Sequence, residues 1–104
     1  MRIQFETEGG FAPIPGLSKP VTIDTTQLPA PEAAHIEGLV HNTSFFGLPA
    51  KLGAPMRGAA DLRTYTITVE EGGQSHTIQV MEPPQDQNLA ALVAHLRAVQ
   101  RGTA

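Results

Sequence analysis

The chain has 104 residues, of which 40% are hydrophobic, and we expect residues 1–104 to form a single domain with one hydrophobic core. Its formal net charge of −3 and its scattered basic residues argue against nucleic acid or an anionic membrane as the partner. The absence of cysteine excludes disulfides, thiolate catalysis and cysteine-based zinc sites.

The first two elements expected along the chain are strands. In residues 2–7, Ile3 and Phe5 alternate with polar side chains, as in a strand with one buried face. The stretch "PVTID" alternates again through Val21 and Ile23. We expect these two strands to pair as a hairpin.

The connection between these strands is unusual. A hairpin turn needs about two to five residues, but the stretch "TEGGFAPIPG" begins a longer connection that carries Phe11 and Ile14. Pro13 and Pro15 restrict its backbone, and the two glycines permit close approach of another chain. The sequence therefore predicts an apolar, conformationally restricted loop.

A helix is expected over residues 31–42, because Pro31 suits its first turn and Ile36 and Val40 share one face. Of the adjacent Phe45 and Phe46, we expect at least one to close the core over the end of this helix. An irregular segment is expected over residues 50–60.

The strongest hairpin signal lies in residues 61–81. The stretch "LRTYTITVE" alternates strictly, "EGGQ" offers two glycines for a tight turn, and "SHTIQVME" returns. Asp86 suits the N-cap of a second helix, whose apolar stripe consists of Leu89, Leu92, Val93, Leu96 and Val99. We expect Leu92 and Leu96 to pack on Ile67 and Ile78.

The element order is therefore β-β-α-β-β-α. Each strand has one apolar face and each helix has one apolar stripe. The predicted fold class is α+β, with a four-stranded, mainly antiparallel sheet and two helices packed on one face.

Signatures of catalysis are scarce. The chain contains no phosphate-binding glycine loop, no H-E-x-x-H and no G-x-S-x-G. Its four histidines are His35, His41, His76 and His95. His35 and His41 do not share a helix face, so we interpret His76 as partly buried and the other three as surface residues, although a zinc site could still assemble in three dimensions. We expect no catalytic residue, no bound metal and no cofactor.

Four motifs taken together resemble the emfourin family: "EGGFA" at 8–12, "FFGLP" at 45–49, "YTITVEEGGQSHTIQV" at 65–80 and "LAALVAHLR" at 89–97. This is a family of small bacterial proteins that inhibit zinc metallopeptidases of the protealysin and thermolysin type. The resemblance covers nearly the whole chain in the right order. Residues 13–20, "PIPGLSKP", are more apolar and richer in proline than the usual loop of that family.

The resemblance implies tight, non-covalent blockage of a protease substrate cleft through a Gly-Gly-Phe loop, without a cofactor. The residues expected to contact the protease are Gly9, Gly10, Phe11, Ala12, Pro13 and Ile14. The residues expected to make secondary contacts are Gly53, Pro55, Met56 and Gly58. Phe11 has two interpretations, an anchor in a specificity pocket of the protease or a core residue beneath the sheet.

Two other functions compete with inhibition. A small adaptor or structural domain could bind a non-protease partner through an exposed strand edge or residues 50–60, and an enzyme could use His35 or His41. We expect the free protein to be monomeric. Because no signal peptide and no membrane-spanning run of about 20 apolar residues is visible, we expect a cytoplasmic location and no membrane partner.

Overall fold

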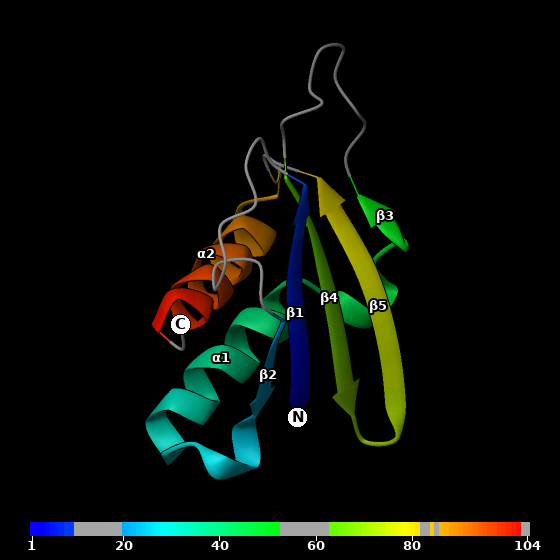
Figure 1. The fold of residues 1–104 in the computed structure, drawn as a ribbon. Helices are drawn as coiled ribbons and strands as arrows, with labels where there is room; N and C mark the ends of the chain where they lie inside the picture. The colour runs from blue at the N-terminus through cyan, green and yellow to red at the C-terminus, as the bar shows by residue number, and fades with distance from the viewer. Residues whose placement is uncertain (10–19, 53–62, 82–83, 85, 103–104) are drawn as a thin grey trace.

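The fold consists of a five-stranded sheet and two α-helices, seen in a computed structural model that describes residues 1–9, 20–52, 63–81, 84 and 86–102 (Figure 1). The strands are β1 (Arg2–Gly9), β2 (Val21–Asp24), β3 (Lys51–Leu52), β4 (Arg63–Glu71) and β5 (Gln74–Met81). The helices are α1 (Ala30–Asn42) and α2 (Gln87–Gly102), and two short 3₁₀ turns are η1 (Thr25–Gln27) and η2 (Phe45–Gly47). The predicted α+β class is confirmed.

The strand order across the sheet is β2-β1-β4-β5-β3. The expected hairpins β1–β2 and β4–β5 are both present and antiparallel, and β1 also pairs antiparallel with β4. The prediction of four strands missed β3, which runs parallel to β5 and makes the sheet mixed. β3 has two residues within the segment interpreted as irregular, and two residues are too few to display an alternating pattern.

The register aligns apolar side chains into rows that cross the sheet. In one row Val21, Phe5, Ile67 and Ile78 lie opposite one another on successive strands, and all four are buried. Along each strand, polar side chains alternate with these apolar ones and point to the other face of the sheet. On that face the hydroxyls of Thr68 and Thr77 lie 2.9 Å apart. The sheet therefore has one apolar face and one polar face.

A two-residue turn joins β4 to β5. Gly72 and Gly73 have φ angles of 58° and 82°, which is the left-handed region that side chains with a Cβ rarely adopt. Positive φ at both central residues is the geometry of a type I′ turn, whose twist matches that of the strands. The two glycines thus fix the register of this hairpin.

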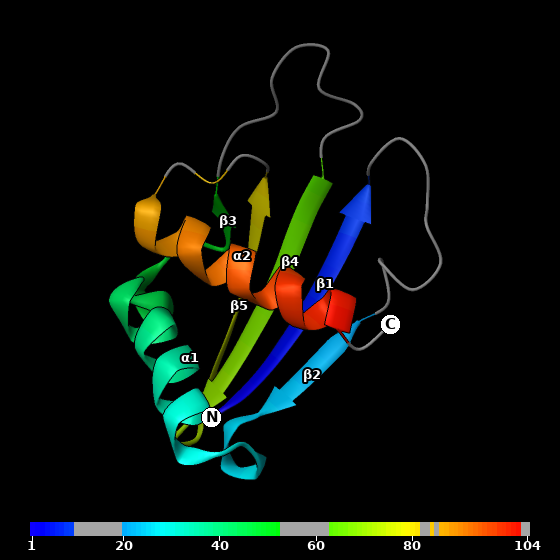
Figure 2. The same cartoon turned by 90° about the vertical axis from the view of Figure 1, so that its left-hand side faces the viewer.

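Both helices pack on the apolar face of the sheet. Figure 2 shows α2 crossing the central strands and α1 lying beside it. Asp86 caps α2 as predicted, because its Oδ1 accepts hydrogen bonds from the backbone N–H groups of Asn88 at 2.7 Å and Leu89 at 3.3 Å. The first helix begins one residue before the predicted Pro31 and ends at the predicted Asn42.

The core lies between the helices and the sheet. Among its buried residues are Phe45 and Tyr65, whereas Phe46 is half-buried against the same cluster. At least one of the two adjacent phenylalanines therefore belongs to the core, as predicted. Leu92 and Leu96 from α2 are fully buried in the cluster that also contains Ile67 and Ile78.

The contribution of α2 to this core can be measured with Leu92→Ala. Leu92 is 0% exposed, so its truncation leaves a cavity and should lower the free energy of unfolding by about 2–5 kcal/mol in urea denaturation. Ala91→Ser, a change at an exposed neighbour on the same helix, is the control and should cost less than about 1 kcal/mol. A loss below about half a kilocalorie for Leu92→Ala would contradict the packing described here.

Candidate functional site

Of the predicted contact residues, the structure describes Gly9, at one end of the sheet. Gly9 is the last residue of β1 and pairs with Arg63, the first residue of β4. The other primary residues, Gly10, Phe11, Ala12, Pro13 and Ile14, lie outside the described part of the chain. The secondary set, Gly53, Pro55, Met56 and Gly58, also lies outside it. The contact role of both sets stays a prediction.

The described residues that flank both segments meet at this end. Residue 10 follows Gly9, and residues 53–62 connect Leu52 to Arg63. Gly9 pairs with Arg63, and Leu52 pairs with Val80 next to the end of β5. Figure 2 shows the ends of β1, β3 and β5 and the start of β4 on the same side of the sheet. The described residues that flank the two segments, Gly9, Leu52 and Arg63, therefore lie at the same end of the sheet.

An aromatic pair supports the sheet close to this end. The rings of Phe5 and Tyr65 are stacked with centroids 5.8 Å apart, and both side chains are buried. The guanidinium carbon of Arg97, on α2, lies 5.8 Å from the centroid of the Tyr65 ring, within the range of a cation–π interaction. The adjacent strands β1 and β4 are thus held to each other and to α2.

A partly buried hydrogen bond also ties β1 to α2. The hydroxyl of Thr7 donates to Oε1 of Gln100 at 3.2 Å, and Gln100 is buried. Thr7 lies two residues before Gly9, directly opposite Tyr65 in the register. Leaving a buried amide without its hydrogen-bond partner destabilises the folded protein. This bond therefore favours one position for the last residues of β1.

The histidines occupy three separate places. Nε2 of His41 lies 3.1 Å from both carboxylate oxygens of Glu71, an exposed ion pair when the ring is protonated. Nε2 of His76 lies 2.7 Å from the backbone oxygen of Leu48, and the ring packs against Phe45. His76 is therefore partly buried and hydrogen-bonded, as predicted.

The third place was missed by sequence reasoning. The rings of His35 on α1 and His95 on α2 form an edge-to-face contact with centroids 5.2 Å apart. His95 is half-buried there, whereas it was expected to be a surface residue. No signal in the sequence relates residues 60 positions apart on different helices, so only the packing of α1 against α2 reveals the pair.

The surroundings of His95 change its acidity. Burial is the main cause that lowers the pKa of His95 below its ordinary value of 6.5, the charge of His35 lowers it further, and Glu32 opposes both. The described residues contain no group of three or more histidine, cysteine, aspartate or glutamate side chains that could hold a metal ion. In the same part of the chain, no helix is long and apolar enough to cross a membrane.

Acid should weaken the packing of α1 on α2. A histidine with a lowered pKa in the folded protein favours its neutral form, so its contribution to stability is complete above about pH 6.5 and is lost as the pH falls toward the folded-state pKa. His95→Gln should therefore lose less stability than the wild type between pH 7.5 and 5, measured by urea denaturation. His35→Gln should flatten the profile in the same direction, by a smaller amount. Equal pH dependence in the wild type and His95→Gln would contradict this role.

One of the comparisons with known proteins gives a match. A family model described as Emfourin matches residues 5–97, which is nearly the whole chain. No curated protein matches, and no solved structure does. The matched range includes the end of the sheet described above and all four histidines.

Proposed function

Because the chain belongs to the emfourin family, a family of metallopeptidase inhibitors, we propose that it inhibits zinc metallopeptidases of the thermolysin and protealysin type. The observation that carries this proposal is the family match over residues 5–97. The protein would bind without covalent chemistry or a cofactor and would block the substrate cleft. In the cytoplasm, it would protect the cell from its own protease before the protease is exported.

The proposed contact surface is the end of the sheet from which the two segments leave. Residues 9–14 would enter the cleft, with Phe11 as the anchor and with Gly9 and Gly10 allowing close backbone approach. Ordering a side chain on binding costs roughly 0.5–1.5 kcal/mol. Pro13 and Pro15 restrict the backbone before binding and would reduce that cost.

The described residues support this proposal by fixing the base of the segment. Gly9 is held in register by Arg63, and Thr7 is tied to the buried Gln100. A rigid base limits the freedom that the segment loses on binding. Gly53, Pro55, Met56 and Gly58, in the segment that follows Leu52, would make supporting contacts, in which the flexible thioether of Met56 could adapt to the protease surface.

The function can be tested by titrating thermolysin and protealysin with the purified protein. We expect activity against a peptide substrate to fall with increasing inhibitor, and added zinc should not restore it. Recovery with zinc would mean that the protein removes the metal rather than blocking the cleft. Undiminished activity of both enzymes at a large molar excess of the protein would contradict the proposal.

The anchor can be tested with Phe11→Ala. As a hot-spot residue, Phe11 should contribute more than ~2 kcal/mol, so its loss should raise the inhibition constant by about thirtyfold or more. The thermal stability of the free protein should stay nearly unchanged. Met56→Ala is the matched variant at the supporting segment and should have a smaller effect on inhibition.

The opposite pattern would assign Phe11 to the core. If Phe11→Ala unfolds the protein, the anchor role passes to the backbone of Gly9 and Gly10 or to residues 50–60. Thermal unfolding of each variant, recorded beside its inhibition curve, separates the two interpretations of this side chain.

A further inference from the structure

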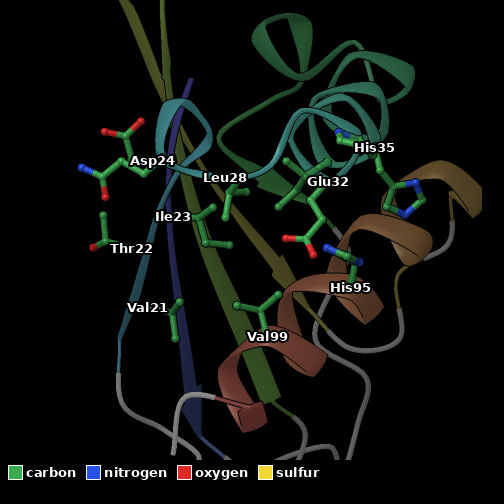
Figure 3. Close-up of a pocket in the computed structure, with 12 residues that line it drawn as sticks. Val21, Thr22, Ile23, Asp24, Leu28, Glu32, His35, His95 and Val99 are labelled. Atoms are coloured by element: carbon green, nitrogen blue, oxygen red, sulfur yellow. The ribbon is translucent and has the colours of Figure 1, made fainter.

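A hollow of about 700 Å³ lies between β2, α1 and α2 (Figure 3). Its floor is apolar and includes Val21, Ile23, Leu28, Ile36 and Val99. Val21 and Ile23 are the most exposed residues of the buried core, at 8% and 7%, and Leu28 and Val99 are only half-buried. The helices thus leave the inner face of the edge strand β2 incompletely covered, and the volume is typical of small-ligand pockets.

The ionisable groups among the described residues that line the hollow are two carboxylates and two histidines. Figure 3 shows the side chains of Glu32 and His95 directed toward each other beside the apolar floor, with His35 above and to the right of His95 in this view. The carboxylates of Glu32 and Asp24 belong to the lining, and no lysine or arginine of the described chain does. Hydrogen bonds from Thr26 lower the pKa of Asp24, which keeps that group ionised near neutral pH.

His95 contributes no positive charge at neutral pH. Burial and the neighbouring His35 lower its pKa, as described above. A neutral imidazole can accept a hydrogen bond through its unprotonated nitrogen. Glu32 and His95 can therefore act together as acceptors for one donor cation. In the described chain, Glu32 accepts no hydrogen bond from another residue, so its carboxylate is available to a ligand.

We propose that this hollow binds an amphiphilic cation, an apolar chain that ends in a protonated amine. The chain would lie on Val21, Ile23 and Val99, and the ammonium group would lie between Glu32 and His95. The described residues that line the hollow come from β2, the turn η1 with Leu28 after it, α1 and α2. The same chemistry occurs in a free alkylamine and in a lysine side chain beside an apolar residue.

Acid should weaken the binding of the cation to the hollow. Protonation of His95 places positive charge next to the bound ammonium. The other titratable groups that line the hollow are His35 and Glu32 on α1 and Asp24 on β2. Affinity for the cation should therefore fall as the pH falls from 7.5 to 5. Affinity for an uncharged ligand with the same alkyl chain should change little.

The test is a titration of the ¹⁵N-labelled protein with hexylammonium, hexanoate and 1-hexanol, followed by amide chemical shifts at pH 7.5. We expect saturable shifts at the lining residues with hexylammonium and binding of hexanoate at least about tenfold weaker. N-acetyl-Leu-Lys-amide is titrated in parallel: tighter binding than hexylammonium assigns the ligand to a protein segment, and weaker binding to a free amine. Both results support the shared chemistry.

Two variants make the test specific. Glu32→Gln should weaken hexylammonium binding about two- to fivefold, the range expected for an exposed ion pair, and should leave 1-hexanol binding unchanged. Glu70→Gln removes an exposed carboxylate outside the lining and should change neither. The proposal is overturned if hexylammonium gives no saturable shifts, if hexanoate binds equally well, or if Glu32→Gln has no effect. The amide spectrum of each variant reports whether it is folded.

Discussion

The inner face of the sheet must be covered, because rows of apolar side chains cross it from the edge strand β2 to β5. The row formed by Val21, Phe5, Ile67 and Ile78 runs from β2 to β5 without a polar residue. Exposing such a row to water is unfavourable in proportion to its area. Both helices therefore pack on this face, and no helix among the described residues lies on the polar face (Figures 1 and 2).

This one-sided packing also gives the sheet end its rigidity. α2 crosses the sheet and contributes Arg97 over the ring of Tyr65 and Gln100 to the hydroxyl of Thr7. Both contacts lie near the point where β1 and β4 end their pairing at Gly9 and Arg63. The core that stabilises the fold is thus the same structure that fixes the base of the proposed inhibitory segments. The stability of the fold and the position of the proposed inhibitory segments are coupled in this protein, because α2 contributes to both.

The placement of the helices has a second consequence at the edge strand β2. Two helices cover the central strands, and their contact places the ring centroids of His35 and His95 5.2 Å apart. The same placement leaves Val21 and Ile23 on β2 less completely buried than the rest of the core. The hollow beside β2 and the contact between His35 and His95 therefore have one origin, which is the position of α1 and α2 relative to the edge strand.

Local pattern determined most of the fold. Strict alternation defined β4 and β5, Gly72 and Gly73 defined their turn, and Asp86 with its apolar stripe defined α2, because each of these signals lies within a few neighbouring residues. Four motifs in order were enough to relate the chain to its family. The two-residue strand β3 could not be predicted, since its pairing with Gln79 and Val80 depends on residues far along the chain. The convergence of Gly9, Leu52 and Arg63 at one sheet end, and the meeting of His35 with His95, were likewise decided only by tertiary structure. Strand order and helix placement are set by the burial of the whole apolar face, which depends on residues distant in the sequence. No local stretch of sequence contains that information.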